Sequence, residues 1–168
     1  LMSITAGITD GSLFGGDGND SFNFTGARAK GVVDTGTGSD SVLLGALADT
    51  ITLTGVLTST TLKAGAEADS IVVKSNMSAG LISLDAGADT LNFTASSVSL
   101  LATTIKGATD ADVVSLYGAN DVVFDLASGD SIFGGTKADT LLFTGSVVNN
   151  SILAGSGNDS IVMAGSGM

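Results

Sequence analysis

Short apolar stretches recur along the whole chain at a nearly constant spacing. Counting one inward-facing residue per stretch gives seventeen positions, separated by nine residues eleven times, by eleven residues four times and by fourteen residues once. A second apolar residue often follows two positions later, as Phe24 follows Phe22. This is the period of a short β-strand with one face in a core. The counted positions are Ile4, Leu13, Phe22, Val33, Val42, Ile51, Leu62, Ile71, Ile82, Leu91, Ile105, Val114, Val123, Ile132, Leu141, Ile152 and Ile161.

Two intervals together form one winding of the chain, so the spacing predicts a repeat architecture. We expect an all-β fold, a right-handed parallel β-roll or β-solenoid, two-sided and flattened, with residues 1–168 as a single solenoid of about eight coils of 18–23 residues. The 24 glycines suit many tight turns, and the absence of proline leaves every strand able to donate to its ladder. The one 23-residue coil, which contains residues 95–102, is interpreted as a tolerated loop or a contact surface.

An aspartate column accompanies the short intervals. In ten of the eleven nine-residue intervals an Asp lies two positions before the apolar residue, whereas the longer intervals have Gly31, Thr60, Gly80, Thr103 and Asn150 there. Alternate turns share an edge of a two-sided coil, so the aspartates should stack in two rows. One edge is predicted to hold Asp20 with Asp40, and then Asp121, Asp139 and Asp159; the other is predicted to hold Asp49, Asp69, Asp89, Asp112 and Asp130.

The first of these acidic turns carries a known motif. The stretch Gly15-Gly16-Asp17-Gly18-Asn19-Asp20-Ser21-Phe22-Asn23 matches the nonapeptide G-G-x-G-x-D-x-U-x at every fixed position. Residues 36–42 and 155–161 are good partial copies, and residues 65–69 keep the Asp but lose glycines. The chain thus resembles a divergent member of the calcium-binding repeats-in-toxin (RTX) family. The resemblance implies Ca²⁺ between same-edge turns of successive coils, with the ten aspartates and backbone carbonyls as oxygen ligands.

The aspartates also have an interpretation without a metal. Asp favours turns by hydrogen-bonding its own backbone, and alanine packing can replace an ion. Coils stack about 4.8 Å apart, and two carboxylates at that distance repel by about 3 kcal/mol at an effective dielectric of about 20. A shared cation would remove this repulsion, so we expect Asp20 and Asp40 to form the best site.

The composition of the chain excludes several kinds of ligand and partner. The net charge of −11 argues against nucleic acid, and the absence of His and Cys removes the usual zinc ligands and nucleophile-base pairs. No apolar run is long enough for a membrane span. Aspartates 17, 34, 85, 110 and 125 fall outside the column, and nothing specific surrounds them, so we do not expect an enzyme.

Two functions follow as expectations. The first is a structural protein of the extracellular space or the bacterial cell surface, such as a filament, surface-layer or adhesin segment, stacked end to end with copies of itself. The spacing allows this, because Ile4 of a following copy would lie eleven residues after Ile161. The alternative, implied by the RTX resemblance, is a non-catalytic calcium-dependent module of a secreted enzyme. A neighbouring catalytic domain would favour the second.

Overall fold

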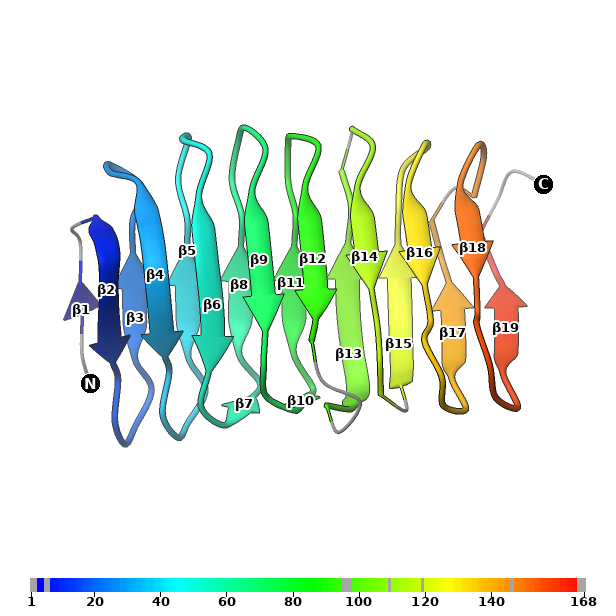
Figure 1. Cartoon of the computed structure of the whole chain (residues 1–168), viewed down its shortest axis with the longest axis horizontal. Coiled ribbons are helices and arrows are strands. Elements are labelled where there is room, and N and C mark those ends of the chain that lie inside the picture. The colour runs from blue at the N-terminus through cyan, green and yellow to red at the C-terminus, as the bar shows by residue number, and fades with distance from the viewer. Residues whose placement is uncertain are drawn as a thin grey trace.

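The computed structural model describes residues 3–4, 7–94, 98–108, 110–118, 120–145 and 147–165. In these residues the chain winds into a row of parallel coils without a helix, about eight turns long (Figure 1). The two termini lie at opposite ends of the row. Residues 95–97, which belong to the predicted 23-residue coil, lie outside the described residues.

One long parallel sheet forms the first side of the solenoid. Its strands follow the order β1-β3-β5-β8-β11-β13-β15-β17-β19, and two short strands, β7 and β10, pair beside β13. The strands are β1 (Ser3–Ile4), β3 (Ser21–Asn23), β5 (Ser41–Leu43), β7 (Leu57–Thr58), β8 (Thr61–Lys63), β10 (Met77–Ser78), β11 (Leu81–Ser83), β13 (Leu100–Lys106), β15 (Asn120–Asp125), β17 (Thr140–Phe143) and β19 (Ser160–Met163).

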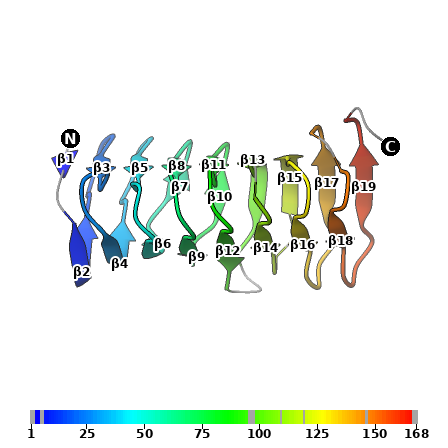
Figure 2. The same cartoon turned by 90° about the horizontal axis from the view of Figure 1, so that it is seen from above.

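A second parallel sheet faces the first across a narrow core (Figure 2). Its order is β2-β4-β6-β9-β12-β14-β16-β18, so each strand pairs with the equivalent strand one coil away. The strands are β2 (Ile8–Phe14), β4 (Ala29–Asp34), β6 (Thr50–Thr54), β9 (Ser70–Val73), β12 (Thr90–Phe93), β14 (Val113–Ser115), β16 (Ser131–Phe133) and β18 (Ser151–Leu153).

The predicted coil length is confirmed by the register of the first sheet. Ser21 pairs with Ser41, Ser41 with Thr61 and Thr61 with Leu81, which gives three coils of 20 residues. The next step, from Leu81 to Thr104, takes 23 residues. The longer coil is therefore accommodated as an extended turn without loss of the parallel ladder.

Alternate side chains of the strands from β3 to β17 are buried in the core. Phe22, Val42, Leu62, Ile82 and Ile105 form one fully buried row along the first sheet, continued by a stacked aromatic pair. The rings of Phe124 and Phe143 in that pair are 5.0 Å apart between centroids. Burying each such side chain contributes about 1.5–3 kcal/mol, so the row stabilises the stacking of the coils.

The predicted strand phase is wrong in β15; in the second sheet Val33 and Ile51 are both buried as predicted, but the register between their strands differs from equal counting. Val123 was expected to face the core, but Val122 and Phe124 on either side of it are buried, so Val123 faces outward. In the second sheet Val33 pairs with Leu53, not with Ile51. Each strand has two inward apolar residues, two positions apart, so a slip of two residues still places an apolar side chain on an apolar neighbour.

Glycine is required where turns of successive coils touch. Gly36 has a φ of 83°, and a Cβ there would overlap the backbone oxygen of Gly16 in the preceding turn. The same contact is bridged by a 2.8 Å hydrogen bond from the Thr37 N–H to the Gly16 carbonyl. These turns therefore stack backbone on backbone, which a side chain would prevent.

We predict that Gly36→Ala lowers the free energy of unfolding by about 2 kcal/mol or more, because it adds both a positive-φ strain and a backbone overlap. Gly26→Ala is the matched control, since a Cβ at Gly26 meets no atom within 4 Å. Urea unfolding followed by circular dichroism measures both. Equal effects of the two substitutions would contradict the stacking of these turns.

Candidate functional site

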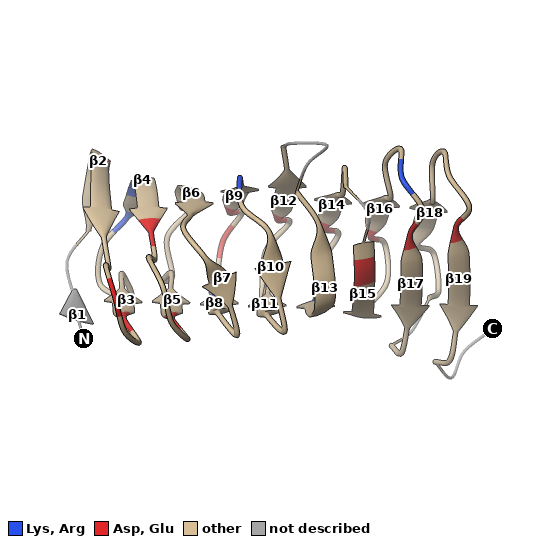
Figure 3. Ribbon diagram, turned by 90° about the horizontal axis from the view of Figure 1, so that it is seen from below, with Lys and Arg blue, Asp and Glu red and all other residues tan. Residues whose placement is uncertain are grey.

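Five aspartates form a buried row along one edge, which we call the long column: Asp49, Asp69, Asp89, Asp112 and Asp130. Each directly precedes a strand of the second sheet, and each is 1–2% exposed. Figure 3 shows acidic positions recurring where the chain enters the strands. The long column matches the predicted row on this edge.

Each carboxylate of the long column is bonded to the coil before it. The Oδ1 atom accepts a hydrogen bond of 2.7–3.0 Å from the backbone N–H one coil earlier: from Ala29 to Asp49, and then from each aspartate to the next. An extended backbone N–H that would otherwise be unpaired at the edge is thereby satisfied. The column thus fastens each coil to the next by a charge-assisted hydrogen bond.

The opposite edge holds two shorter groups of the same kind. Asp20 and Asp40, the N-terminal pair, are 2% exposed, and the Asp20 N–H donates to Asp40 Oδ1 at 2.9 Å. Asp139 and Asp159, the C-terminal pair, repeat this bond at 3.1 Å. Both pairings were predicted from the sequence. The role of these residues as metal ligands remains a prediction.

The second carboxylate oxygen, Oδ2, makes no hydrogen bond in most of these turns. Among the described residues, Oδ2 has no hydrogen-bond partner in Asp40, Asp69, Asp89, Asp112, Asp130 and Asp139, although each atom is buried. In Asp49 the same atom accepts a 3.2 Å bond from the Gly45 N–H. A buried anionic oxygen without a partner costs several kcal/mol and calls for a proton or a cation. This is the strongest chemical signal in the molecule.

Burial shifts the acidity of the carboxyls. Desolvation raises the pKa of Asp69 and Asp89 to about 6 and that of Asp112 to about 7, with backbone hydrogen bonds opposing the rise and neighbouring aspartates adding to it. Burial likewise raises the pKa of Asp130 and Asp139. Without a cation, part of the column is therefore protonated near neutral pH.

Asp121 does not belong to the column. It is exposed and pairs in register with Thr140, a strand residue, because the phase of β15 differs by one residue from the prediction. Asn120 occupies the column position instead and is 5% exposed. Its N–H donates to Asp139 Oδ1 at 3.0 Å, as an aspartate N–H does elsewhere.

A second asparagine ends the long column. Asn150 Oδ1 accepts the Asp130 N–H at 2.9 Å, so its side chain takes the place of the next aspartate. The spacing already placed Asn150 two residues before Ile152, and an amide oxygen accepts a hydrogen bond as a carboxylate does. The position of Asn150 was thus predicted but not its role as an acceptor, and Asn120 was missed because the phase of β15 differs by one residue.

The middle coils of the first edge have no acidic turn. Leu57, Met77 and Leu100 are buried there and stack on one another in β7, β10 and β13. Leu100 in turn pairs with Asn120, so the apolar row leads directly into the C-terminal group. In the longer neutral intervals, buried apolar side chains thus take the place of the carboxylates.

Five aspartates outside the columns bond to residues of their own turn or of an adjacent coil. Asp17 accepts from Thr37 Oγ1 at 2.9 Å, Asp34 from the Gly36 N–H, Asp85 from Ser83 Oγ and Asp110 from the Gly87 N–H, while Asp125 lies 3.4 Å from Lys106 Nζ. Asp110 and Asp112 accept from the N–H groups of Gly87 and Asp89, which belong to one turn of the preceding coil. Their hydrogen bonds are those of structural turn residues.

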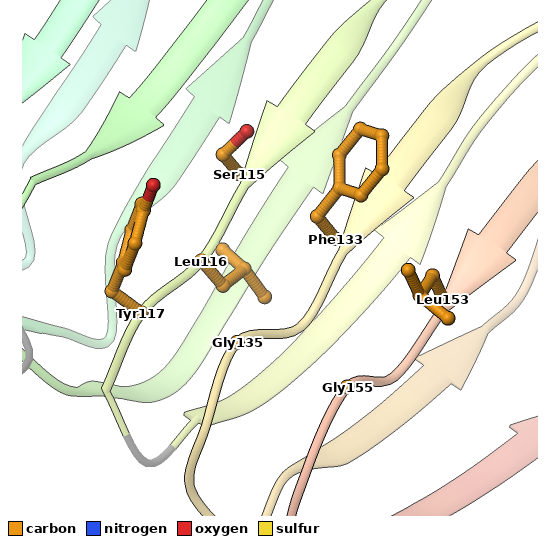
Figure 4. Close-up of a pocket in the computed structure, with 7 residues that line it drawn as sticks. All are labelled: Ser115, Leu116, Tyr117, Phe133, Gly135, Leu153 and Gly155. Carbon is orange, nitrogen blue, oxygen red and sulfur yellow. The ribbon is translucent and has the colours of Figure 1, made fainter.

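A shallow apolar pocket lies on the outer face of the second sheet (Figure 4). It encloses about 410 Å³ and is lined by Ser115, Leu116, Tyr117, Phe133, Gly135, Leu153 and Gly155. Phe133 and Leu153 project side by side from neighbouring strands and are 42% and 60% exposed. This pocket forms part of an apolar patch near the last coils.

Comparisons with protein-family models, curated proteins and solved structures give no match to the chain. In the part of the chain that the structure describes, no helix is long and apolar enough to cross a membrane, and no three acidic side chains converge on one point. Any cation in the columns would accordingly need backbone carbonyls or water besides two carboxylates.

We predict that the metal-free protein is stabilised by acid. A folded-state pKa raised to about 6 or 7 contributes stability that is fully present below the unfolded value of 3.8 and is lost as the pH rises through the folded value. The free energy of unfolding in chelator should therefore be higher at pH 5 than at pH 8.

Asp89→Asn keeps the oxygen that accepts the hydrogen bond and removes one buried titrating group, so it should flatten this pH dependence. Asp121→Asn removes an exposed carboxyl of the same charge and should leave the slope nearly unchanged. Identical slopes in the two variants, measured by urea unfolding, would show that surface repulsion, and not the column, sets the pH response.

Proposed function

We propose that this chain is a structural β-solenoid segment of the extracellular space or bacterial cell surface, a divergent relative of RTX proteins whose coils are held together by Ca²⁺ at the acidic columns. The observation that carries the proposal is the series of buried carboxylates with a partnerless Oδ2. A rod with two flat sheets and repeated turns suits a scaffold, because its length grows by simple addition of coils.

The residues of the columns fit a calcium ion. Each pair offers two carboxylates from successive coils, and a hard cation accepts further oxygen ligands from carbonyls and water at flexible geometry. The residues that would hold it are Asp20 with Asp40, successive members of the long column, and Asp139 with Asp159. Asp121 is excluded from this set by its exposed position.

Calcium would supply positive charge where like charges stack. At a coil spacing of about 4.8 Å, each neighbouring pair of ionised carboxylates repels by about 3 kcal/mol at an effective dielectric of about 20. Four such steps lie within the long column. Extracellular calcium modules bind with Kd values of about 10⁻⁴ to 10⁻³ M, so ions would fill such sites outside a cell.

We predict that millimolar Ca²⁺ at pH 7.5 raises the melting temperature of the protein and that a chelator reverses the rise. Asp40→Asn should remove part of the calcium response, because it replaces the partnerless oxygen of the N-terminal pair by an N–H donor. Asp121→Asn is the control and should keep the full response. A wild-type melting temperature and calorimetric titration that are indifferent to calcium would refute the metal sites.

The proposal also includes continuation of the stack beyond β19. Ile161, Val162 and Met163 in this strand are 39–47% exposed, and Leu153 in β18 is 60% exposed. Leu141 and Phe143, the equivalents of Ile161 and Met163 one coil earlier, are buried. A further parallel coil, from a copy of this chain, would cover this apolar edge by β-augmentation.

We predict that the protein associates end to end and that Ile161→Asp weakens the association at least tenfold, because it places a charge in the new core row. Val56→Asp is the matched control, since Val56 is 53% exposed within the body of the stack. Light scattering over a range of concentrations measures the mass. A wild-type protein that stays monomeric at every concentration would oppose this part of the proposal.

A further inference from the structure

Two of the acidic groups border another kind of turn through an asparagine. Asn120 lies at the start of the C-terminal group, between Leu100 and Asp139. Asn150 lies at the end of the long column, after Asp130. At both places the step between two coils has one carboxylate and one carboxamide, in contrast to the two carboxylates of the other steps.

The side-chain NH₂ group of Asn120 donates hydrogen bonds at the position that a cation shared by two carboxylates would occupy. Its Nδ2 lies 2.6 Å from the Gly118 carbonyl and 2.8 Å from Asp139 Oδ1, so it bridges a turn carbonyl of one coil and the carboxylate of the next. These are the two kinds of oxygen that a hard cation takes as ligands. Asp139 Oδ1 thereby accepts two bonds from Asn120, one from Nδ2 and one from the backbone N–H.

Asn150 makes an equivalent bridge with its orientation reversed. Its Oδ1 accepts the N–H groups of Gly129 and Asp130 at 2.7 and 2.9 Å, which is the contact an aspartate makes elsewhere. Its Nδ2 donates to the Ala127 carbonyl at 3.0 Å, in the turn that leads to Asp130. A carbonyl that would otherwise face the cation is thus occupied by an N–H donor.

Resting on the proposed calcium sites, we infer that Asn120 and Asn150 are specificity-determining residues, whose side-chain N–H groups take the place of calcium at these two steps. The carboxamide keeps the acceptor that fastens the coils. It removes one negative charge and adds a donor at the position of a ligand, so the step needs no ion. The long column consequently has a defined end at Asn150 and the C-terminal pair a defined start at Asn120, and calcium is confined to steps with two aspartates.

The test is the number of ions bound by Asn120→Asp and Asn150→Asp. Each variant recreates a two-carboxylate step and should bind about one more Ca²⁺ per chain than the wild type in equilibrium dialysis. In chelator each should melt at a lower temperature than the wild type, and calcium should restore most of the loss. Asn149→Asp adds the same charge at an exposed neighbouring residue and should change neither quantity.

The outcomes separate this inference from the proposed function. If the wild type binds calcium but Asn120→Asp and Asn150→Asp gain no ion, or calcium does not restore their melting temperature, the inference alone is overturned. A wild type that binds no calcium overturns the proposed function. In that case a gain of binding in Asn120→Asp or Asn150→Asp still supports the role of the amides, and the absence of any gain removes it.

Discussion

The hydrogen bond from a backbone N–H to the carboxylate of the next coil is the interaction on which the edges of this solenoid depend. The sheets satisfy the backbone within the strands, but the N–H of the residue just before each strand has no ladder partner of its own. An aspartate one coil later provides the acceptor, as Asp69 does for Asp49. In the acidic turns, repetition of this bond gives the edge the same spacing as the sheets, so strands and turns stack there with one period.

The same bond holds negatively charged carboxylates close together in a buried position, where they repel one another. Only one carboxylate oxygen is used, and the other is buried beside a similar group one coil away. A proton can neutralise it, which agrees with the raised pKa of Asp112 to about 7. A calcium ion can do so at neutral pH without loss of the acceptor, and a carboxamide in place of one aspartate removes the second negative charge of the step. Proton, ion and amide are thus three solutions to one constraint.

Much of this arrangement was predictable from spacing alone. The nine-residue interval predicts the coil, and the Asp two positions before each apolar residue predicts the long column and both pairs. The phase of β15 was not predictable, because Val122 and Val123 are both apolar and either could face the core. Because of that ambiguity, Asp121 was predicted at the column position that Asn120 occupies. The slip between Val33 and Ile51 has a similar origin, and the partnerless oxygens depend on side-chain orientation, which no pattern of residues contains.

Native-state hydrogen exchange of the backbone amides tests the central claim most directly. The N–H groups of Asp49, Asp69 and Asp89 each donate to a buried carboxylate, so they should exchange only through global unfolding, as slowly as amides in the middle of β9 or β12. If these amides instead exchange as fast as those of exposed turn residues such as Glu67, the carboxylates do not fasten the coils and the account of both edges is wrong.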